Sequence, residues 1–282
     1  MPKVTSLELI SEARLKGHAV GAFNVYNLES VQAVAQGVKE ANSGVIFQIT
    51  KSAVDYAGLK NIYDIVMNNI DIYNIPAAIH LDHGPSLEMV DECLEIGFSS
   101  VMFDGSSLPF KENIEKSRAS VEKAHAHKAT CEAELGRLVG TEDEISVDEK
   151  NAIYTNPDEA LEFVESTGID LLAVAIGNAH GFYKGEPHID FERLGEIRKK
   201  VDVHLVLHGA SGIPDESIQK AIKSGIGKIN IDTEFRYATM RGIEDYLSED
   251  AGTSAARNAL AAGRERMKQK VIEKINLFRP SN

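Results

Sequence analysis

The sequence predicts an α/β fold, a closed (β/α)8 TIM barrel with extra helices at its C-terminal end, and three observations support this prediction. Short β-rich runs alternate with helix-length segments along the chain. Eight such runs precede the tail, and eight units in about 250 residues favour this barrel over an open doubly wound sheet. Most runs are nearly uninterrupted apolar stretches, as expected for parallel strands that are covered on both faces.

The eight predicted strands are rich in apolar and β-branched residues and lie between turn or helix signals. They are Ala19–Asn24, Val45–Ile49, Ala77–Leu81, Ser100–Phe103, Thr130–Leu135, Leu171–Ala175, His204–Leu207 and Lys228–Ile231.

The segments between the strands carry start and stop signals of helices. The clearest helix covers 156–168, which opens with an N-cap asparagine, a proline at the first helical position and two acids, and closes at a glycine. A second opens at Pro214 and ends at Gly225, and a third runs from Ser86 to Ile96 before Gly97. This alternation favours a parallel α/β fold.

Two regions depart from the alternation. Residues 136–155 separate the fifth strand from its helix and are rich in glycine and acids, which is typical of a functional or disordered loop. Residues 235–277 predict more than one helix. Because no linker, repeat or low-complexity run is visible, we expect one domain over 1–282, with the barrel over about 1–235 and a helical extension over about 236–282.

Composition limits the possible partners. The chain has 282 residues, is 43% hydrophobic and 26% charged, and carries a formal net charge of -13, so nucleic acid and an anionic membrane surface are not expected partners. A small phosphorylated substrate is compatible, because backbone N–H groups and a metal ion make a site locally positive. No export or membrane segment is visible, and Cys93 and Cys131 lack paired spacing, which predicts buried thiols in a reducing cytoplasm.

Reactive groups of such a barrel are expected just past the C-terminal ends of its strands. Titratable or glycine-rich motifs occur at that place on six strands. They are His80-Leu-Asp-His-Gly84, Asp104-Gly-Ser-Ser107, Glu132-Ala-Glu-Leu-Gly136, Gly177-Asn-Ala-His-Gly181, His208-Gly-Ala-Ser-Gly212 and Asn230-Ile-Asp-Thr233.

Three of these motifs carry a histidine directly after a predicted strand: His83, His180 and His208. Any one alone is more often structural, but three at matching places predict a zinc site, because three imidazoles with a fourth position open is the usual catalytic arrangement. Asp104 and Glu134 are either ligands of an additional or displaced metal, or acceptors that orient a histidine. The sequence leaves these two interpretations open.

Glycine and hydroxyl groups after the seventh and eighth strands occur where such barrels commonly bind phosphate, although the glycines would also serve tight turns alone. The expected phosphate-binding residues are Gly209, Ala210, Ser211, Asn230, Ile231, Asp232 and Thr233. Gly181 permits close approach of a ligand, and Lys184 would add positive charge. The segment 225–228 is not interpreted as a nucleotide loop, since it precedes a strand.

These motifs together make the chain resemble the class II, metal-dependent ketose-bisphosphate aldolases, in six blocks in the right order over nearly the whole length. The segments 134–138 and 175–181 look most like the tagatose-bisphosphate branch, whereas 230–233 is also seen in fructose-bisphosphate members. The resemblance implies reversible cleavage of a ketohexose 1,6-bisphosphate to dihydroxyacetone phosphate and glyceraldehyde 3-phosphate through a zinc-stabilised enediolate. The alternative is the same mechanism on another phosphorylated ketose or sugar acid with a different aldehyde partner.

The resemblance also implies individual roles. His83, His180 and His208 would hold one zinc ion per chain, and Asp104 and Glu134 match secondary metal positions. Asp82 would act as acid and base on the aldehyde oxygen, and Glu142, on a mobile loop, would remove the proton from dihydroxyacetone phosphate. A monovalent cation near the phosphate, a homodimer or homotetramer, and a cytoplasmic location are further expectations from the family.

The chain departs from the family pattern at several places. Ser107 stands where many members have histidine, Val139-Gly140 replaces a double glycine, and the tail has Ala255-Ala-Arg257 where Asp-Pro-Arg is expected. Lys51 follows the second strand, where smaller residues are common. Lys51 or Arg257 is therefore expected to bind the distal phosphate, and the alternative for Lys51 is a solvated residue on the rim of the barrel. Asn24 and Ser52 are further expected substrate-binding residues.

Three other functions compete with this one. A Schiff-base aldolase would use Lys51 or Lys228 as the nucleophile and need no metal. A metal-dependent hydrolase usually has a His-x-His pair after the first strand, where this chain has Phe23-Asn24. A binding module without chemistry would not need both Asp82 and Glu142.

Overall fold

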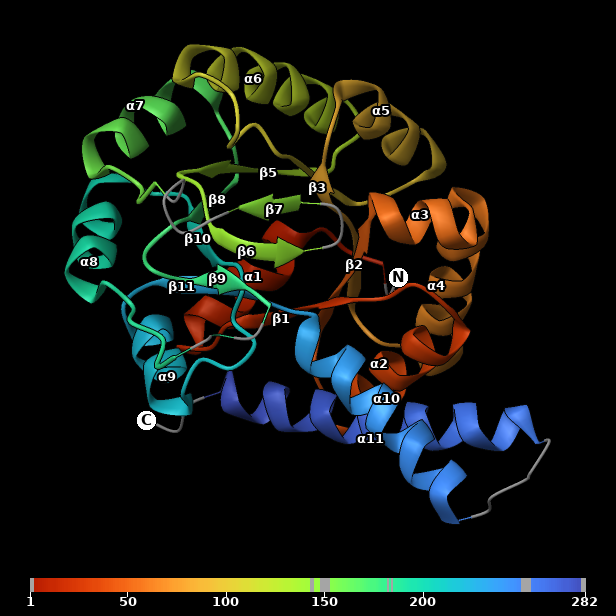
Figure 1. The fold of residues 1–282 in the computed structure, drawn as a ribbon. Helices are drawn as coiled ribbons and strands as arrows, with labels where there is room; N and C mark the ends of the chain where they lie inside the picture. The colour runs from red at the N-terminus through yellow and green to blue at the C-terminus, as the bar shows by residue number, and fades with distance from the viewer. Residues whose placement is uncertain are drawn as a thin grey trace.

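Eight parallel strands close into a barrel in the order β1-β11-β10-β8-β5-β4-β3-β2, with helices around it (Figure 1). The predicted (β/α)8 fold is therefore confirmed. The structure is a computed structural model that describes residues 3–142, 145–147, 153–181, 183, 185–249 and 255–279. No side chain is described at 139, 141, 142 or 145–147.

The barrel strands agree closely with the predicted runs. They are β1 (Val20–Asn24), β2 (Val45–Thr50), β3 (Ala77–Gly84), β4 (Ser100–Phe103), β5 (Thr130–Leu135), β8 (Leu171–Val174), β10 (His204–Leu207) and β11 (Ile226–Ile231). The largest differences are at β3, which extends to Gly84 because Gly84 pairs with Phe103 beyond a register shift, and at β11, which begins before Lys228. Gly227 thus lies inside a strand.

Helices follow the strands, as the capping signals predict. They are α1 (Ser6–Leu15), α2 (Leu28–Glu40), α3 (Lys51–Ala57), α4 (Leu59–Tyr73), α5 (Leu87–Ile96), α6 (Phe110–Ala126), α7 (Pro157–Thr167), α8 (Phe191–Lys200), α9 (Asp215–Lys223), α10 (Thr233–Glu249) and α11 (Ala256–Leu277). The helix predicted over 156–168 is confirmed: Asn156 caps α7 by accepting from the N–H groups of Asp158 and Glu159, and Gly168 ends it with a left-handed backbone, φ 72°.

Helix α1 closes the end of the barrel where the strands begin. The Leu7 amide donates to Thr130 at the start of β5, Ser11 contacts His204 at the start of β10, and Arg14 donates to the Ile226 carbonyl at the start of β11. The C-terminal ends of the strands are the place where a site is expected, as in other barrels of this class.

A small second sheet lies over the other end, drawn in front of the barrel in Figure 1. It has the order β7-β6-β9 and is formed by β6 (Val139–Glu142), β7 (Ile145–Val147) and β9 (Ala179–His180). The segment 136–155, expected to be a loop, thus contains an antiparallel pair, β6 and β7, whose β6 strand also pairs with β9. The loop expected over 136–155 therefore contains regular structure at 139–142 and 145–147, because β6 pairs with β9 on one side and with β7 on the other.

The last two helices form a hairpin that projects to one side of the barrel (Figure 1). Helices α10 and α11 pack on each other, and α11 also packs on α2. A Cβ atom at Gly242 would lie 2.6 Å from the Ala262 carbonyl oxygen, so glycine permits this close packing. The expected boundary near 235 falls inside α10. Among the described residues, no helix combines the length and hydrophobicity that a bilayer crossing requires.

Candidate active site

The interior of the barrel changes from apolar to polar along the strand direction. Alternate residues of each strand face inward, and near α1 these are apolar, such as Ala22, Ile46 and Ala78. Two residues further along the same strands the chain has Asn24, Gln48 and His80, all buried. The two-residue alternation thus places polar side chains together at the C-terminal end of the barrel.

Three histidines come together there, although they occupy different kinds of position. His83 lies within the extended β3, His208 follows β10, and His180 lies in β9 of the small sheet. One ring nitrogen from each histidine lies within 4.8 Å of the corresponding nitrogens of the other two. The three histidines can therefore hold a metal ion.

The expectation that all three directly follow a strand was wrong for His83 and His180. β3 continues past the expected end, with His83 in a left-handed backbone, φ 48°, that is unusual for a side-chain-bearing residue. The segment 175–178 connects β8 to β9, which contains His180, and it turns at Gly177, φ 98°. Backbone pairing with β6 at Gly140 then holds it, and a Cβ at Gly140 would lie 2.1 Å from the His180 carbonyl oxygen.

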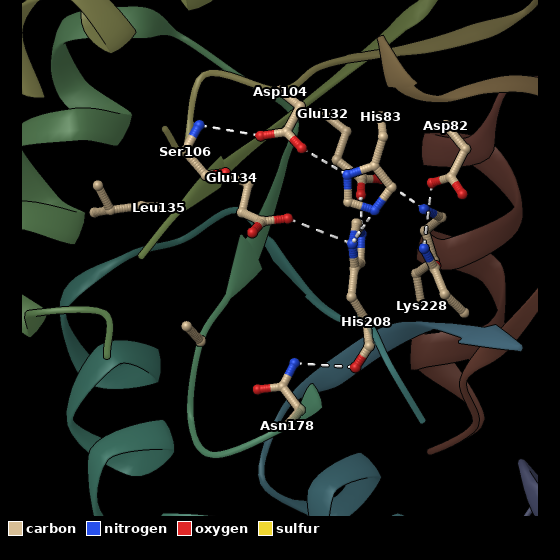
Figure 2. A network of polar contacts seen from close by, with 12 residues as sticks. Asp82, His83, Asp104, Ser106, Glu132, Glu134, Leu135, Asn178, His208 and Lys228 are labelled. Carbon is tan, nitrogen blue, oxygen red and sulfur yellow. Dashed lines mark hydrogen bonds and ion pairs between the residues drawn. The ribbon is translucent and has the colours of Figure 1, made fainter. Parts of the chain in front are cut away.

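His83 connects the centre of the site to a carboxylate on the next strand. Its Nδ1 lies 2.6 Å from Asp104 Oδ2, and its Nε2 lies 3.1 Å from His208 Nδ1 (Figure 2). The Ser106 amide donates to the other oxygen of Asp104 at 3.0 Å. Burial by itself raises the pKa of Asp104, but the hydrogen bonds and charge of His83, with Ser106, outweigh it and hold the pKa below its usual range.

His208 has the same kind of arrangement on the opposite side. Its Nε2 lies 2.9 Å from Glu132 Oε1, and its Nδ1 lies 3.4 Å from Glu134 Oε2. Burial raises the pKa of Glu132, but the Lys228 ammonium and the His208 hydrogen bond outweigh this effect and lower it. Burial lowers the pKa of His208, which favours a neutral ring.

The ring nitrogens of His83 and His208 that face each other suit a shared cation. An ionised carboxylate only accepts hydrogen bonds, so Asp104 and Glu132 each take the N–H of a neutral ring on its outer side. The inner nitrogens, His83 Nε2 and His208 Nδ1, then direct lone pairs at one another across 3.1 Å. Two lone pairs at that distance repel unless a cation lies between or beside them. The donor set therefore fits a divalent metal that imidazole nitrogen binds.

The two expected carboxylates lie on different sides of this centre. Asp104 contacts the outer nitrogen of His83, whereas Glu134 approaches the inner nitrogen of His208. A second group of possible ligands also combines Asp104 and Glu134 with His83, within 4.8 Å. The structure thus brings both residues to the centre, with Asp104 in the position of an orienting acceptor.

Asp82 lies beside the histidines, fully buried, and three side-chain amides hold it. Asn24 and Gln48 donate to its Oδ2 at 3.1 and 3.0 Å, and Asn230 donates to its Oδ1 at 3.4 Å. Gln48 also donates to the Asn24 oxygen at 2.9 Å. Residues of β1, β2 and β11 therefore fix the orientation of one carboxylate on β3.

The expected phosphate-binding residues lie together on neighbouring strands. Gly209–Ser211 follows β10, and Asn230–Thr233 ends β11 and begins α10. The Glu234 amide donates to Ser211 Oγ at 3.4 Å, and Glu234 accepts from the Gly212 amide at 2.9 Å, which joins the two segments. Gly209 has φ 60°, and a Cβ there would lie 2.2 Å from the Ala179 oxygen.

Of three other expected residues, Gly181 is described, and the other two are described only in part or not at all. Gly181 directly follows His180 and has φ 83°. Lys184 lies outside the described residues, and Glu142 has a described backbone, in β6, without a described side chain.

A cavity of about 370 Å³ lies beside Asn24, one of the residues that contact Asp82. Its lining includes Asn24, Ser52, Asp232, Arg236 and Tyr56. Arg236 is the single Arg or Lys among the described lining residues, and it pairs with Asp232 at 2.7 Å. The structure therefore brings Asn24 and Ser52 to one cavity, and their binding of substrate stays a prediction.

Lys51 and Arg257 do not line that cavity. Lys51 begins α3, with its side chain 49% exposed, and pairs with Asp55. Arg257 is exposed in the first turn of α11, and the α10–α11 hairpin projects away from the barrel at that end (Figure 1).

Several residues of the site had no role assigned from the sequence: Gln48, His80, Glu132, Lys228 as an ion-pair partner, and Arg236. Four of them are buried inside the barrel: Gln48, His80, Glu132 and Lys228. Three of them precede a predicted site residue by two positions on the same strand, so the inward-facing alternation was the signal that could have found them. Arg236 lies in the first turn of α10, one helical turn after Asp232, and had no such signal.

Comparison with known proteins identifies the family. The model of the family described as fructose-bisphosphate aldolase class-II matches residues 4–282. The chain belongs to the class II fructose-bisphosphate aldolase family. This aldolase is therefore a metal-dependent lyase, and its three-histidine group is consistent with the metal site of the class.

Solved structures agree with this assignment. The aldolase is similar to the YdjI aldolase of Escherichia coli K12, with 34% identity and a TM-score of 0.85 over 96% of this chain and 95% of that one. It is similar to a candidate fructose-1,6-bisphosphate aldolase of Coccidioides immitis, with 30% identity and a TM-score of 0.87 over 97% and 95%. The fructose-bisphosphate aldolase of Campylobacter jejuni shares the fold, at 24% identity and a TM-score of 0.84 over 99% and 97%.

Proposed function

We propose that this class II aldolase reversibly cleaves a ketohexose 1,6-bisphosphate, fructose or tagatose, to dihydroxyacetone phosphate and glyceraldehyde 3-phosphate, with one zinc ion per chain. The observation that supports this most is the convergence of His83, His180 and His208 beside the amide-held carboxylate of Asp82. A zinc ion held by these imidazoles would polarise the ketone and stabilise the negative charge that develops on its oxygen.

Asp82 is the group that moves a proton at the bond to be cleaved. In the cleavage direction its carboxylate accepts the proton of the sugar hydroxyl that becomes the aldehyde oxygen, and in the synthetic direction it returns that proton. Three amide donors keep its oxygens in one orientation, which general acid-base catalysis requires. Glu142 is proposed as the second proton-transfer group, the one that acts on the carbon of dihydroxyacetone phosphate.

The phosphate of the triose half is proposed to bind between β10 and β11. There Gly209 leaves its backbone open to close approach, and the N-terminus of α10 adds a partial positive charge. Gly181 and Lys184 are proposed to complete this side. A monovalent cation beside the phosphate stays a prediction, tested by the effect of potassium on the KM for the substrate.

Two buried acceptors support a polyhydroxyl substrate. Gln48 Oε1 and Asn230 Oδ1 have no hydrogen-bond partner among the described residues, although both amides also donate to Asp82. Buried acceptors without donors are unfavourable, and the hydroxyl groups of a sugar are donors. A sugar chain lying past Asp82 would satisfy both.

The aldehyde half is proposed to lie in the cavity that Arg236, Ser52 and Asn24 line. Arg236 supplies the charge expected for a distal phosphate and is proposed in place of Lys51 and Arg257, which do not line the cavity. Because Arg236 already pairs with Asp232, a sugar acid or another phosphorylated ketose with a different aldehyde partner is the alternative substrate.

The substrate is tested by a coupled cleavage assay on fructose 1,6-bisphosphate and tagatose 1,6-bisphosphate side by side, with and without zinc. The proposal expects one of the two to be cleaved with a kcat/KM at least tenfold above the other, and only with metal. Absence of cleavage of both, together with zinc-dependent deprotonation of dihydroxyacetone phosphate, would select the alternative aldehyde partner. We also expect a cytoplasmic homodimer or homotetramer, to be measured by light scattering.

A further inference from the structure

A buried chain of charged and polar side chains runs across the barrel below the histidines, and the proposed mechanism does not use it. Lys228 Nζ lies 2.8 Å from Glu132 Oε2 and 3.4 Å from His80 Nε2. His80 Nδ1 lies 2.7 Å from Ser100 Oγ. These side chains are fully buried and come from β3, β4, β5 and β11. Four strands thus contribute to one connected network.

The direction of each hydrogen bond in this network follows from the available donors. Lys228 has only donors, so Glu132 Oε2 and His80 Nε2 accept from it, and the Nδ1–H of a neutral His80 donates to Ser100. Glu132, paired with an ammonium group, is a carboxylate and accepts on its other oxygen as well. The contact with His208 Nε2 at 2.9 Å is therefore a donation from the ring to Glu132. A neutral His208 then carries no proton on Nδ1.

We propose that Glu132 and Lys228 are positioning residues that hold His208 in the tautomer with a proton on Nε2, so that its Nδ1 lone pair is directed at the metal centre. This inference rests on the proposed function in that His208 is a metal ligand. Glu132 acts directly on the ring, and Lys228 acts through Glu132 by fixing which of its oxygens faces the ring. Figure 2 shows Glu132 between Lys228 and His208.

The arrangement is not explained by core stability alone. A buried ion pair is often no more stabilising than apolar side chains of the same volume, because both charges lose their hydration. Here one oxygen of Glu132 accepts from the Lys228 ammonium, and the other contacts the His208 ring, which faces the metal centre. Carboxylates behind metal-binding histidines fix ring orientation and tautomer, and their loss typically costs 10- to 100-fold in metal affinity.

The variant Glu132→Gln tests the proposal because Lys228 dictates how the new amide must turn. The ammonium needs an acceptor, so the glutamine oxygen faces Lys228 and its NH2 faces His208 Nε2. The ring must then accept at Nε2 and carry its proton on Nδ1, toward the centre. We expect zinc affinity, measured by competition with a chromophoric chelator, to fall about 10- to 100-fold.

The double variant Glu132→Gln/Lys228→Met separates tautomer control from packing. Without the ammonium, the glutamine oxygen is free to turn toward His208 and accept its Nε2 proton. We expect the second substitution to restore zinc affinity to within about fivefold of wild type, although it removes a second buried polar group. Ser100→Ala is the matched control, because it alters the far end of the network and leaves both bonds to Glu132 in place. Its zinc affinity should stay within about threefold of wild type.

A second measurement does not depend on zinc, and its wild-type result stands even if Glu132→Gln fails to fold. Long-range nitrogen–proton NMR spectra of the metal-free wild-type protein report which ring nitrogen of His208 carries the proton, with His208→Gln used for assignment. The proposal expects Nε2–H in the wild type and Nδ1–H in Glu132→Gln. Any of three results would overturn the proposal. They are an Nδ1–H tautomer in the wild type, an unchanged zinc affinity in Glu132→Gln, and a double variant that binds zinc more weakly than Glu132→Gln alone. Failure of the wild type to bind zinc would instead contradict the proposed function and leave the tautomer test intact.

Discussion

The inner ring nitrogens of His83 and His208 lie 3.1 Å apart although the two residues are 125 positions apart in the sequence. Each ring has a carboxylate at its outer nitrogen, Asp104 for His83 and Glu132 for His208. The barrel thus directs two ring nitrogens toward one point from opposite sides, and this relationship connects the fold to metal-dependent chemistry.

Asp82→Asn should lower kcat by about 100- to 10,000-fold, because the amide no longer takes or returns the proton of the reacting hydroxyl. Zinc content should stay at the wild-type level, since Asp82 contacts amides of Asn24, Gln48 and Asn230. Steady-state kinetics with metal analysis of the same preparation measures both. Asp71→Asn, at an exposed position of α4, is the control. A kcat within threefold of wild type would contradict the role of Asp82.

Arg236→Met should lower kcat/KM for the bisphosphate about 10- to 100-fold, because a charge-assisted hydrogen bond to the distal phosphate is lost. The effect should be at least fivefold smaller for a substrate without that phosphate. Arg257→Met should leave kcat/KM unchanged for both substrates if each chain binds substrate by itself, since Arg257 is exposed outside the cavity. If Arg257→Met has the larger effect, a second copy of the chain must bring Arg257 to the site, and the role of Arg236 is contradicted.

Glu234→Ala should reduce the free energy of unfolding by about 3 kcal/mol, because it leaves a buried ammonium group without its partner. Glu234 Oε2 lies 2.8 Å from Lys274, whose side chain is only 5% exposed, and Glu234 also accepts from the Gly212 amide. Urea denaturation measures the change. Glu273→Ala, which breaks the exposed pair with Lys270, should cost less than about 1 kcal/mol. Equal effects of the two substitutions would show that burial of the Lys274 pair is unimportant.

The two thiols should resist alkylation in the folded protein. Burial raises the pKa of Cys93 and of Cys131 to about 12. A raised pKa favours the neutral thiol, and only the thiolate reacts, so about one thiol in 10,000 is ionised at pH 8. Iodoacetamide at pH 8 should label both cysteines in urea and neither in the native enzyme, with activity retained. Rapid labelling of the native protein with loss of activity would contradict this prediction.

The strands were predictable because two local properties coincide along the whole chain. Apolar runs mark strands covered on both faces, and capping residues such as Asn156 mark where the intervening helices begin. The meeting of His83 and His208 followed, since the carboxyl ends of parallel strands meet at one end of the barrel. Asp104 and Asp82 were predictable for the same reason.

The place of His180 was not predictable in this way. It depends on the pairing of β9 with β6, two segments that meet because Gly140 allows backbone contact, and such pairing between short loop strands has no local sequence signal. The function of Glu132 and Lys228 as partners was hidden for a different reason. Each lies in a run that reads as an ordinary strand, and only their shared inward direction brings them to His208. Lys51 illustrates the reverse case, because a position after a strand end did not bring it into the cavity.

The most direct test of the central claim is a zinc titration of metal-stripped wild-type enzyme beside His208→Ala, with bound zinc and cleavage activity measured in the same samples. The account predicts that wild-type activity rises in proportion to zinc and reaches its plateau at one equivalent per chain. His208→Ala should bind zinc at least 100-fold more weakly and stay inactive at that point. Full activity of the stripped enzyme, combined with loss of activity after borohydride treatment with substrate, would contradict the account and favour a lysine-based mechanism.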